Sequence, residues 1–530
     1  MNKIATFLNA RISGLVTDKP EILAAYSRDA SILEIMPKIL AIPASTEDVQ
    51  YLVRFVNELA KKGYQLPITV RGSGLDTSGA DLSDQLVLST ERLNQIQEID
   101  DRERLVRVQA GVTLGQLNSA LSLFGLTLPI EADPKETLGG LVSNFYTDKI
   151  AKKYGSIYYY VERIEAVLAD GELFQSQALT SRGLKQAQKR ADLQGQIYSR
   201  IHQITQQKSA QIEDLRSNAH HHSGFRMITE VSSQKSLFDL TPLFFGAQGS
   251  LGVITELILR VVAIPRPTKK ALFTFSQAKP AIQFMSELEK LRPKRIDFYD
   301  TRVFQALTLP KKESTFLDQI RGQFLVFAEI DHGFFTNKAS RKTLQQLAKH
   351  ATATLFDQPD NLAQFSQLAK KLDFYRNDPD YPERVIIADQ SYLPKTELVS
   401  FLNSLTTLEQ IFGQPLPLFG SFTTNLYSVR PTFDLSTVTD RKQLLRFMQQ
   451  YGKLIHDSSG TIAAGSAEGR VQAIVFNQTL PTQIRALFYE IKTTFDPNHI
   501  FNPKIKQNAS LADLARFMRT SPQIGLIRQD

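Results

Sequence analysis

The chain is organised around one stretch, Arg71-Gly72-Ser73-Gly74-Leu75-Asp76-Thr77-Ser78-Gly79. It directly follows an apolar run at residues 66–70, which predicts a strand. Glycine permits positive φ angles and a close approach of the backbone to a ligand, so consecutive N–H groups can form a concavity that suits a pyrophosphate. An ordinary glycine-rich turn is the alternative at this point. The stretch matches neither the P-loop nor the G-x-G-x-x-G spacing.

Cysteine is absent from the 530 residues. Its absence excludes disulfides, thiolate catalysis, thiolate zinc sites and cysteine-held iron–sulfur clusters. Any redox chemistry therefore needs a bound organic cofactor or a non-thiolate metal. The length predicts two or more domains, and a hydrophobic fraction of 42% with a charged fraction of 22% is typical of an ordinary globular protein.

The net charge of +8 is spread along the chain. A mildly basic solvated surface is its simplest interpretation, and weak attraction to anionic membranes or to an acidic ligand is the alternative. Nucleic-acid binding needs a clustered basic face with stacking aromatics, and the sequence has neither. No apolar run is long enough to span a bilayer, and residues 1–10 lack a signal-peptide pattern. We therefore expect a cytoplasmic protein, for which peripheral membrane contact stays open.

Strand and helix patterns alternate on both sides of the glycine-rich stretch, which predicts an α+β protein. Residues 39–42 predict a strand, and Ser45 is placed to cap the amphipathic helix after it. The best boundary is Ile264-Pro265-Arg266-Pro267, because two prolines end a strand abruptly. We expect a helical lead-in at residues 1–37, a first domain at 38–264, a second at 265–455 and a C-terminal segment at 456–530.

Two further glycine-rich loops follow in order, Thr137-Leu138-Gly139-Gly140 and Gly249-Ser250-Leu251-Gly252. The order and the sequences of the three glycine-rich loops resemble those of the FAD-binding domain of the vanillyl-alcohol oxidase / p-cresol methylhydroxylase type. The likeness is closest to the branch with D-lactate and glycolate dehydrogenases and FAD-linked C-terminal domains. The matching pieces are residues 43–49, 71–74, 108–112, 137–140, 153–156, 168–171, 249–255, 495–497 and 502–503.

The resemblance implies a two-subdomain FAD domain and an α/β cap domain with an antiparallel sheet, which covers the substrate. The C-terminal segment would return to the flavin. The FAD-binding residues that the resemblance implies are Arg71, Gly72, Ser73, Gly74, Leu75, Asp76, Thr137, Leu138, Gly139, Gly140, Ser143, Asn144, Gly155, Val161, Ile254 and Asn502. The first loop has Leu75 and Asp76 where a tethering histidine can stand in the family, and cysteine is absent, so we expect non-covalent FAD.

In the 2-hydroxy-acid dehydrogenases of this branch, a Gly-His-x-x-x-Gly-Asn-Leu-His motif and a later Gly-Glu-His-Gly motif bind a divalent metal. This chain has Ser421 and Tyr427 (or Ser428, because the spacing slips by one) where the first two histidines should stand. Gly465 and Ser466 replace the Glu-His pair. Serine and glycine cannot hold a divalent ion and a lone tyrosine is a poor substitute, so we expect no metal.

Loss of the metal also removes the usual candidate for the general base. Tyr427, Glu468 and His456 lie nearest to the altered motifs, although a solvated or structural role is the commoner one for Glu468 and His456. Arg376 resembles the family arginine that meets a substrate carboxylate, and Arg430 precedes a family proline; a surface salt bridge is the equal alternative for each. We select Tyr427, Glu468 and Arg430 as catalytic candidates and Arg376 as the substrate-binding candidate.

The remaining histidines carry less information. His220-His221-His222 looks like a metal tract, but adjacent side chains point apart, so we expect no metal there. His499 lies in an Asp-Pro-Asn turn and is expected to be structural.

The combined prediction is an FAD-dependent dehydrogenase that takes a hydride from a small polar alcohol or 2-hydroxy acid without metal. Its electrons would pass to an external acceptor, such as a quinone, an electron carrier or oxygen. Two alternatives stay open: a flavin-binding protein that has lost hydroxy-acid turnover, and a sugar or sugar-alcohol oxidase.

Overall fold

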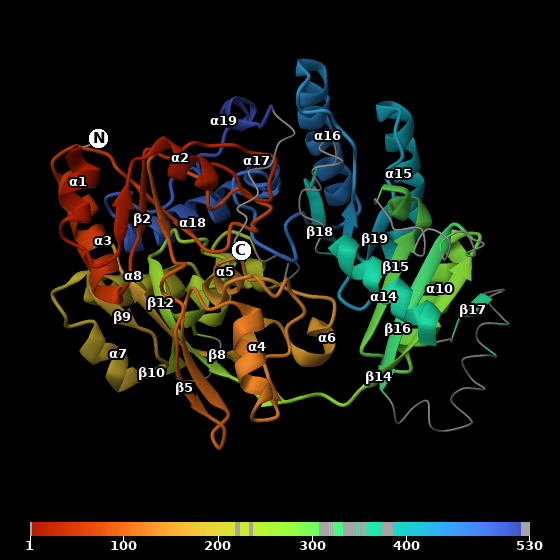
Figure 1. The fold of residues 1–530 in the computed structure, drawn as a ribbon, viewed down its shortest axis with the longest axis horizontal. Coiled ribbons are helices and arrows are strands. Elements are labelled where there is room, and N and C mark those ends of the chain that lie inside the picture. The colour runs from red at the N-terminus through yellow and green to blue at the C-terminus, as the bar shows by residue number, and fades with distance from the viewer. Residues whose placement is uncertain are drawn as a thin grey trace.

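The computed structural model describes residues 3–217, 223–232, 237–306, 322–331, 354–356, 359–373 and 385–520, with single residues at 317, 320, 346 and 349. These residues form three main sheets covered by helices, so the α+β prediction is confirmed. Two sheets lie in the left half of Figure 1, and the seven-stranded sheet lies in the right half. In the described residues, no helix has both the length and the apolar character needed to cross a membrane.

The first sheet places the glycine-rich stretch. Its order is β1 (Leu15–Thr17), β2 (Ile39–Ile42), β4 (Leu86–Ser89) and β3 (Ile68–Arg71), and the last three strands are parallel. α1 (Lys3–Asn9) and α3 (Thr46–Lys61) pack on this sheet, and the Ser45 hydroxyl accepts a hydrogen bond from the Asp48 amide at the start of α3. Because parallel strands end at one edge, the loops after β3 and β4 begin side by side.

The second sheet is antiparallel, in the order β5 (Ile96–Asp100), β6 (Leu105–Gln109), β12 (Val253–Arg260), β8 (Val161–Val167) and β9 (Leu173–Gln175). α4 (Leu114–Ser122), α5 (Leu138–Ser143) and α8 (Leu193–Gln207) contribute to the core that it buries. Three further helices lie around this sheet: α6 (Ala151–Tyr154), α7 (Ser181–Ala187) and α9 (Ser209–Ser217). Two short antiparallel pairs accompany it: β7 (Leu126–Thr127) pairs with β13 (Val262–Ala263), and β10 (Leu179–Thr180) pairs with β11 (Leu237–Phe238).

The third sheet, which we call the cap sheet, is wholly antiparallel. Its order is β17 (Thr354–Phe356), β14 (Thr268–Phe275), β16 (Phe324–Asp331), β15 (Arg295–Asp300), β19 (Leu418–Ser421), β20 (Leu426–Val429) and β18 (Ala388–Tyr392). α10 (Ala278–Glu289), α15 (Leu398–Phe412) and α16 (Val438–Asp457) bury one face, and α14 (Pro359–Asp373) packs on part of the other. Side chains of one strand alternate between these faces.

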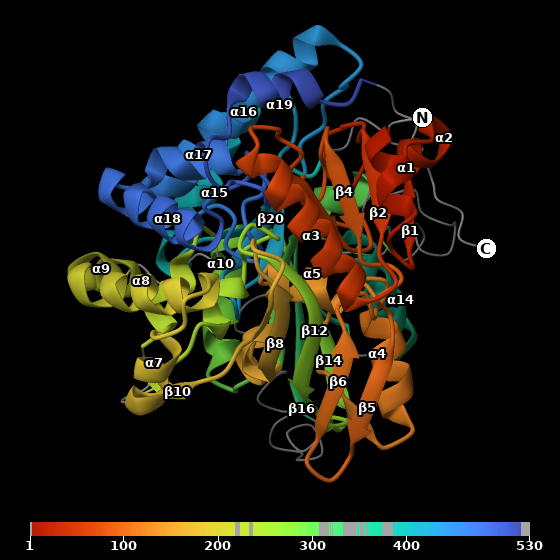
Figure 2. The ribbon, with the colours of Figure 1, turned by 90° about the vertical axis from the view of Figure 1, so that its left-hand side faces the viewer.

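The C-terminal segment returns to the first domain. α17 (Ala473–Thr479), α18 (Thr482–Phe495) and α19 (Leu511–Phe517) lie in the upper part of the molecule in both views, and α18 contacts α8 (Figure 2). The Ile68 amide donates to the Ile500 carbonyl at 2.7 Å, and the Asn502 amide donates to the Ile68 carbonyl at 2.8 Å. These bonds fix the chain end beside β3.

Two expectations need correction. Residues 1–37 are not a helical lead-in throughout: α1 ends at Asn9, β1 follows, and α2 (Pro20–Leu23) is a single turn. Strand β1 forms because residues 15–17 can pair with the exposed edge of β2. The strand β5 was not predicted, because its apolar residues Ile96 and Ile99 do not alternate and a bulge between Ile96 and Glu98 shifts the register.

Candidate functional site

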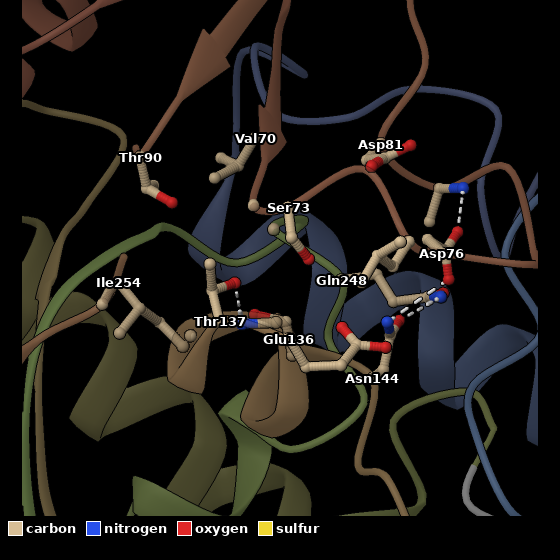
Figure 3. A pocket seen from close by; sticks show the side chains of 18 of the residues that line it. Val70, Ser73, Asp76, Asp81, Thr90, Glu136, Thr137, Asn144, Gln248 and Ile254 are labelled. Atoms are coloured by element: carbon tan, nitrogen blue, oxygen red, sulfur yellow. Dashed lines mark hydrogen bonds between the residues drawn. The ribbon is translucent and has the colours of Figure 1, made fainter. Parts of the chain in front are cut away.

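The loop after β3, the start of α5 and the loop before β12 line a cavity, which we call the glycine pocket. Figure 3 shows that it runs from Thr137 and Ile254 at one end to Asp76, Asn144 and Gln248 at the other. Its lining comes from five separated segments: residues 70–81, residue 90, residue 110, residues 136–144 and residues 248–254.

The first glycine loop presents its backbone to this pocket. The amides of Gly72, Ser73 and Gly74 donate no hydrogen bond to any other part of the described chain. Gly74 has a φ of +71°, and a Cβ at this position would overlap with the Arg71 guanidinium. A Cβ on Gly72 would overlap with the Thr137 hydroxyl. Unpartnered amides around a concavity fit a phosphate group.

The second glycine loop forms the facing wall. Thr137 caps α5 by accepting a hydrogen bond from the Gly140 amide at 3.3 Å. Gly139 packs directly on Ala110, because a Cβ there would lie 2.9 Å from the Ala110 Cβ. This close contact lets the start of α5 line the pocket.

The polar end of the pocket is a network of side chains. Asp76 accepts hydrogen bonds from the Ala80 amide at 2.8 Å and from Asn144 Nδ2 at 3.3 Å, and Gln248 Nε2 donates to Asn144 Oδ1 at 3.0 Å. Burial, with the neighbouring Asp81 carboxylate, raises the pKa of Asp76 to about 6.

Asp76, Asp81 and Asp29 bring their carboxylates together beside this network. Burial and the two neighbouring carboxylates raise the pKa of Asp29 well above its usual range. The Arg71 guanidinium already lies 3.5 Å from Asp81. The Arg71 guanidinium disfavours a second cation here, and the raised pKa values of Asp29 and Asp76 favour their protonation over binding of a divalent cation.

The pocket brings most of the expected cofactor residues together. Those that line it are Gly72, Ser73, Gly74, Leu75, Asp76, Thr137, Gly139, Gly140, Ser143, Asn144 and Ile254. Sequence reasoning missed Glu136 and Gln248, which also line it. Gln248 directly precedes the third glycine loop, so its position was a usable signal.

Five expected residues do not line the pocket. Arg71 supports the first loop from behind by donating to the Arg28 carbonyl at 2.7 Å. Asn502 supports the first and third loops, since its Nδ2 donates to the carbonyls of Ala80 and Gln248. Leu138 is buried in the core beneath α5. Gly155 and Val161 lie outside the pocket lining, at the end of α6 and the start of β8.

Two further cavities continue from the glycine pocket toward the cap sheet. We call the nearer one the junction cavity; it shares Leu75, Asp76, Glu136, Gly140 and Asn144 with the glycine pocket. The farther one, the cap cavity, lies between α4 and the cap sheet and shares Tyr146, Asp389, Gln390 and Arg430 with the junction cavity. The three cavities therefore form one route from the glycine loops to the cap sheet.

Cationic groups outnumber carboxylates at the floor of the cap cavity. Lys149, Lys270, Lys294 and Arg295 share Glu131, Asp297 and Glu329, with N···O distances between 2.8 and 3.8 Å. Burial alone would lower the pKa of Lys294, but the carboxylates of Glu131 and Glu329 raise it above the ordinary value. The described lining of the cap cavity has one more cation than it has carboxylates, which favours an anionic ligand. The five cations are Lys149, Lys270, Arg295, Lys370 and Arg430, and the four carboxylates are Glu131, Asp148, Glu329 and Asp389.

The structure separates the catalytic candidates. Arg430 lines both the junction cavity and the cap cavity. Tyr427 points to the opposite face of β20, into the core under α15 and α16. Glu468 is fully buried, where it accepts from the Gly224 amide at 2.9 Å and pairs with Lys506 at 3.1 Å. The geometry therefore brings only Arg430 to a cavity.

The other candidates are placed as follows. His456 is exposed in the last turn of α16, and His499 has a φ of +53° in the turn after α18. Arg376 and the histidines at 220–222 lie outside the described residues.

The positions that correspond to the family's metal ligands do not fit a divalent cation. Ser421 is buried and shares a hydrogen bond with Thr423 at 2.8 Å. Ser428, not Tyr427, lines the cap cavity. A Cβ on Gly465 would lie 2.5 Å from Gln390 Oε1, so Gln390 fills the space that a larger residue at 465 would need. Hydroxyl groups and an amide are a poor donor set for such an ion.

Comparisons with known proteins agree with this arrangement. Residues 37–176 match the FAD binding domain, and residues 264–505 match the C-terminal domain of FAD linked oxidases. The fold is similar to that of p-cresol methylhydroxylase with a TM-score of 0.68 at 15% identity, covering 95% of this chain and 96% of the other. It is also similar to alkyldihydroxyacetonephosphate synthase with a TM-score of 0.63 at 15% identity, covering 92% of this chain and 82% of the other.

Curated relatives include a D-2-hydroxyglutarate dehydrogenase of Pantoea ananatis, 23% identical over 95% of this chain and 51% of that protein. Glycolate oxidase subunit GlcD of Bacillus subtilis is 21% identical over 90% of this chain and 91% of its own length. The chain thus spans about half the length of the D-2-hydroxyglutarate dehydrogenase. The unpartnered amides of the glycine pocket fit the pyrophosphate of FAD. The chain thus carries an FAD binding domain followed by the C-terminal domain of FAD linked oxidases, on the fold of p-cresol methylhydroxylase, with FAD as its cofactor.

Proposed function

We propose that this protein oxidises a small 2-hydroxy acid with FAD and without a metal, and passes the electrons to an external acceptor. The observation that carries the proposal is that the junction cavity shares lining residues with both the glycine pocket and the cation-rich cap cavity. Relatives named as dehydrogenases of D-2-hydroxyglutarate and D-lactate support the substrate class. A quinone, an electron carrier and oxygen stay open as the acceptor.

In this proposal, the glycine loops hold the dinucleotide and the cap sheet holds the substrate. When bound, FAD supplies a flavin N5 that accepts a hydride. The amides of Gly72, Ser73 and Gly74 bind the pyrophosphate, and Thr137 keeps the start of α5 against it. Arg430 and the cations beneath the cap cavity attract and orient the substrate carboxylate.

We also propose that FAD is bound without a covalent tether. The described lining of the glycine pocket contains neither histidine nor cysteine, and Leu75 has no group that could form such a bond. Acid precipitation of the purified protein tests this point, since untethered flavin moves wholly to the supernatant. Yellow colour that remains in the pellet would contradict it.

The substrate proposal is tested by anaerobic reduction of the bound flavin with D-lactate, glycolate and D-2-hydroxyglutarate. We expect at least one of them to bleach the flavin absorbance, and dithionite serves as the control that the flavin is reducible. If dithionite bleaches the flavin and all hydroxy acids fail, the chain is a flavin-binding protein without this turnover. Peroxide formation with a sugar alcohol would instead favour the oxidase alternative.

A further inference from the structure

Asp389 stands where the two inner cavities meet. The carboxylates that line the cap cavity are Glu131, Asp148, Glu329 and Asp389, and those that line the junction cavity are Asp76, Glu136 and Asp389, among the residues that the structure describes. Asp389 is therefore the one carboxylate common to both described linings. Leu75 and Gly140 of the glycine loops line the same junction cavity.

Strand β20 holds this carboxylate in place. Ser428 Oγ donates to Asp389 Oδ1 at 2.6 Å, and Arg430 Nη1 donates to the same oxygen at 3.1 Å. The Ser428 hydroxyl also accepts from the Gln390 amide at 3.0 Å, which ties β18 to β20. Both donors stabilise the ionised form of the carboxylate.

Arg430 is buried, whereas Asp389 stays accessible from the cavities. The Arg430 side chain is only 7% exposed, whereas that of Asp389 is 25% exposed. Other ionisable groups nearby are Asp76 and Glu136 across the junction cavity, and Tyr451 of α16 behind the sheet. Lys149 and Arg295 line the cap cavity farther along the same route. A substrate carboxylate drawn to these cations would lie in the cavity that Asp389 also lines.

We propose that Asp389 is the catalytic base that accepts the hydroxyl proton of the substrate, and that Ser428 is the positioning residue that orients it. This inference rests on the proposed oxidation of a 2-hydroxy acid. As the hydride and its electron pair leave the substrate carbon for oxidised flavin, the O–H bond breaks. Its electrons form the C=O bond of the 2-oxo acid, and the proton goes to the Asp389 carboxylate. In this proposal, a carboxylate of β18 accepts the hydroxyl proton at a site that has lost the metal ligands of the 2-hydroxy-acid dehydrogenases.

Binding of oxalate to the FAD-loaded protein tests this placement without turnover. Oxalate puts one carboxylate where the substrate carboxylate binds and an anionic oxygen where the hydroxyl oxygen reacts. Two facing carboxylates cannot both stay ionised, so the wild type should take up about one proton on binding near neutral pH. Calorimetry in two buffers of different ionisation enthalpy measures this uptake.

The Asp389→Asn variant should bind oxalate with almost no proton uptake and with an affinity that does not depend on pH. Wild-type affinity should instead rise up to about tenfold for each unit by which the pH falls. Asp457→Asn, an exposed carboxylate of α16, is the matched control and should behave as the wild type does. Equal proton uptake in the wild type and in Asp389→Asn, or no oxalate binding by the wild type, would overturn the inference.

Flavin reduction gives the second readout. Asp389→Asn should slow it about 10²- to 10⁴-fold, which is the usual contribution of a general base, and the rate should then rise with pH as hydroxide replaces the lost base. Ser428→Ala should slow reduction while proton uptake persists, and Ser428→Thr should restore it. If Asp389→Asn does not fold, these serine variants still test whether Asp389 is the base that Ser428 orients. Proton uptake on oxalate binding could depend on Asp389 while no 2-hydroxy acid reduces the flavin of the wild type. That result would refute the proposed substrate class but not the role of Asp389 as the base.

Discussion

Gly72 leaves no room for a side chain between the two glycine loops, because a Cβ would overlap with the Thr137 hydroxyl. We expect Gly72→Ala to push Thr137 off its cap and to narrow the pyrophosphate site. The dissociation constant of FAD should rise at least about tenfold, since 1.4 kcal/mol is a factor of ten. Fluorescence titration of the FAD-free protein measures this constant.

Gly183→Ala is the matched control, because Gly183 lies in α7, away from the glycine pocket. A Cβ there would lie 3.5 Å from its nearest neighbour, the Leu179 side chain, which is an ordinary contact. It should leave FAD affinity unchanged and stabilise the helix by about 0.5–1 kcal/mol. Normal FAD affinity in Gly72→Ala would show that the facing loops do not clamp the dinucleotide.

Glu468 and Lys506 form a buried ion pair, in which Lys506 Nζ also donates to the Gly224 carbonyl at 3.2 Å. Glu468→Gln leaves the lysine buried without its anion, which costs about 3–5 kcal/mol of unfolding free energy. Urea unfolding measures this loss, and the folded fraction should reduce its flavin at the wild-type rate. If Glu468→Gln stays as stable as the wild type but no longer reduces its flavin, Glu468 has a catalytic role and not a structural one.

At the scale of the element, the alternation of β20 decides which of two adjacent residues meets the substrate. Burial raises the pKa of Tyr427 well above its ordinary value, and its hydroxyl finds no hydrogen-bond partner within the described chain. Tyr427→Phe should therefore keep the wild-type rate of flavin reduction. Its unfolding free energy should be equal or up to about 1 kcal/mol higher, because an unpartnered buried hydroxyl is removed.

Ser428→Ala, one residue farther along the same strand, is the comparison for this pair. It should slow flavin reduction and lower the unfolding free energy by about 2–3 kcal/mol, because its hydroxyl makes two hydrogen bonds, one of them to the Asp389 carboxylate. Slow reduction in Tyr427→Phe together with normal reduction in Ser428→Ala would mean that the register of β20 is shifted by one residue.

The same strand shows where sequence reasoning reached its limit. The glycine loops could be predicted because their function lies in the backbone, and only glycine meets the conformational demand at Gly74. The functional face of β20 could not be predicted, since a register slip of one residue exchanges Tyr427 for Ser428. Asp389 carried no motif at all; its role depends on β18 pairing with β20, which joins residues that are far apart in sequence.

At the scale of the whole molecule, the site depends on contacts that spacing along the chain cannot reveal. Asn502 bonds to Thr69 across more than four hundred residues, and the Gly469 amide donates to Gln248 Oε1 at 3.0 Å. The resemblance to the FAD-binding family indicated Asn502, whereas Gln248 emerged only from the folded chain. The C-terminal segment therefore belongs to the framework of the glycine pocket, although it lies far from the first glycine loop in sequence.

Buried carboxylates make the stability of the FAD-free protein depend on pH. Burial raises the pKa of Asp148 to about 7, and burial with Asp81 raises that of Asp76 to about 6. The native state thus holds protons that the unfolded chain has already released above about pH 4, so the unfolding free energy falls as the pH rises from 5 to 7. Asp148 alone should account for about 2–3 kcal/mol of this fall.

Urea unfolding at pH 5, 6, 7 and 8 measures this dependence. The midpoint should decrease up to about pH 8 and then level off, because both groups are almost fully ionised in the native state above that pH. Asp148→Asn, which cannot titrate, should make the slope between pH 5 and 7 shallower, whatever its effect at a single pH. A midpoint that rises over this range would mean that Asp148 is ionised in the folded protein, and that the cations near the cap cavity, Lys294 among them, outweigh its burial.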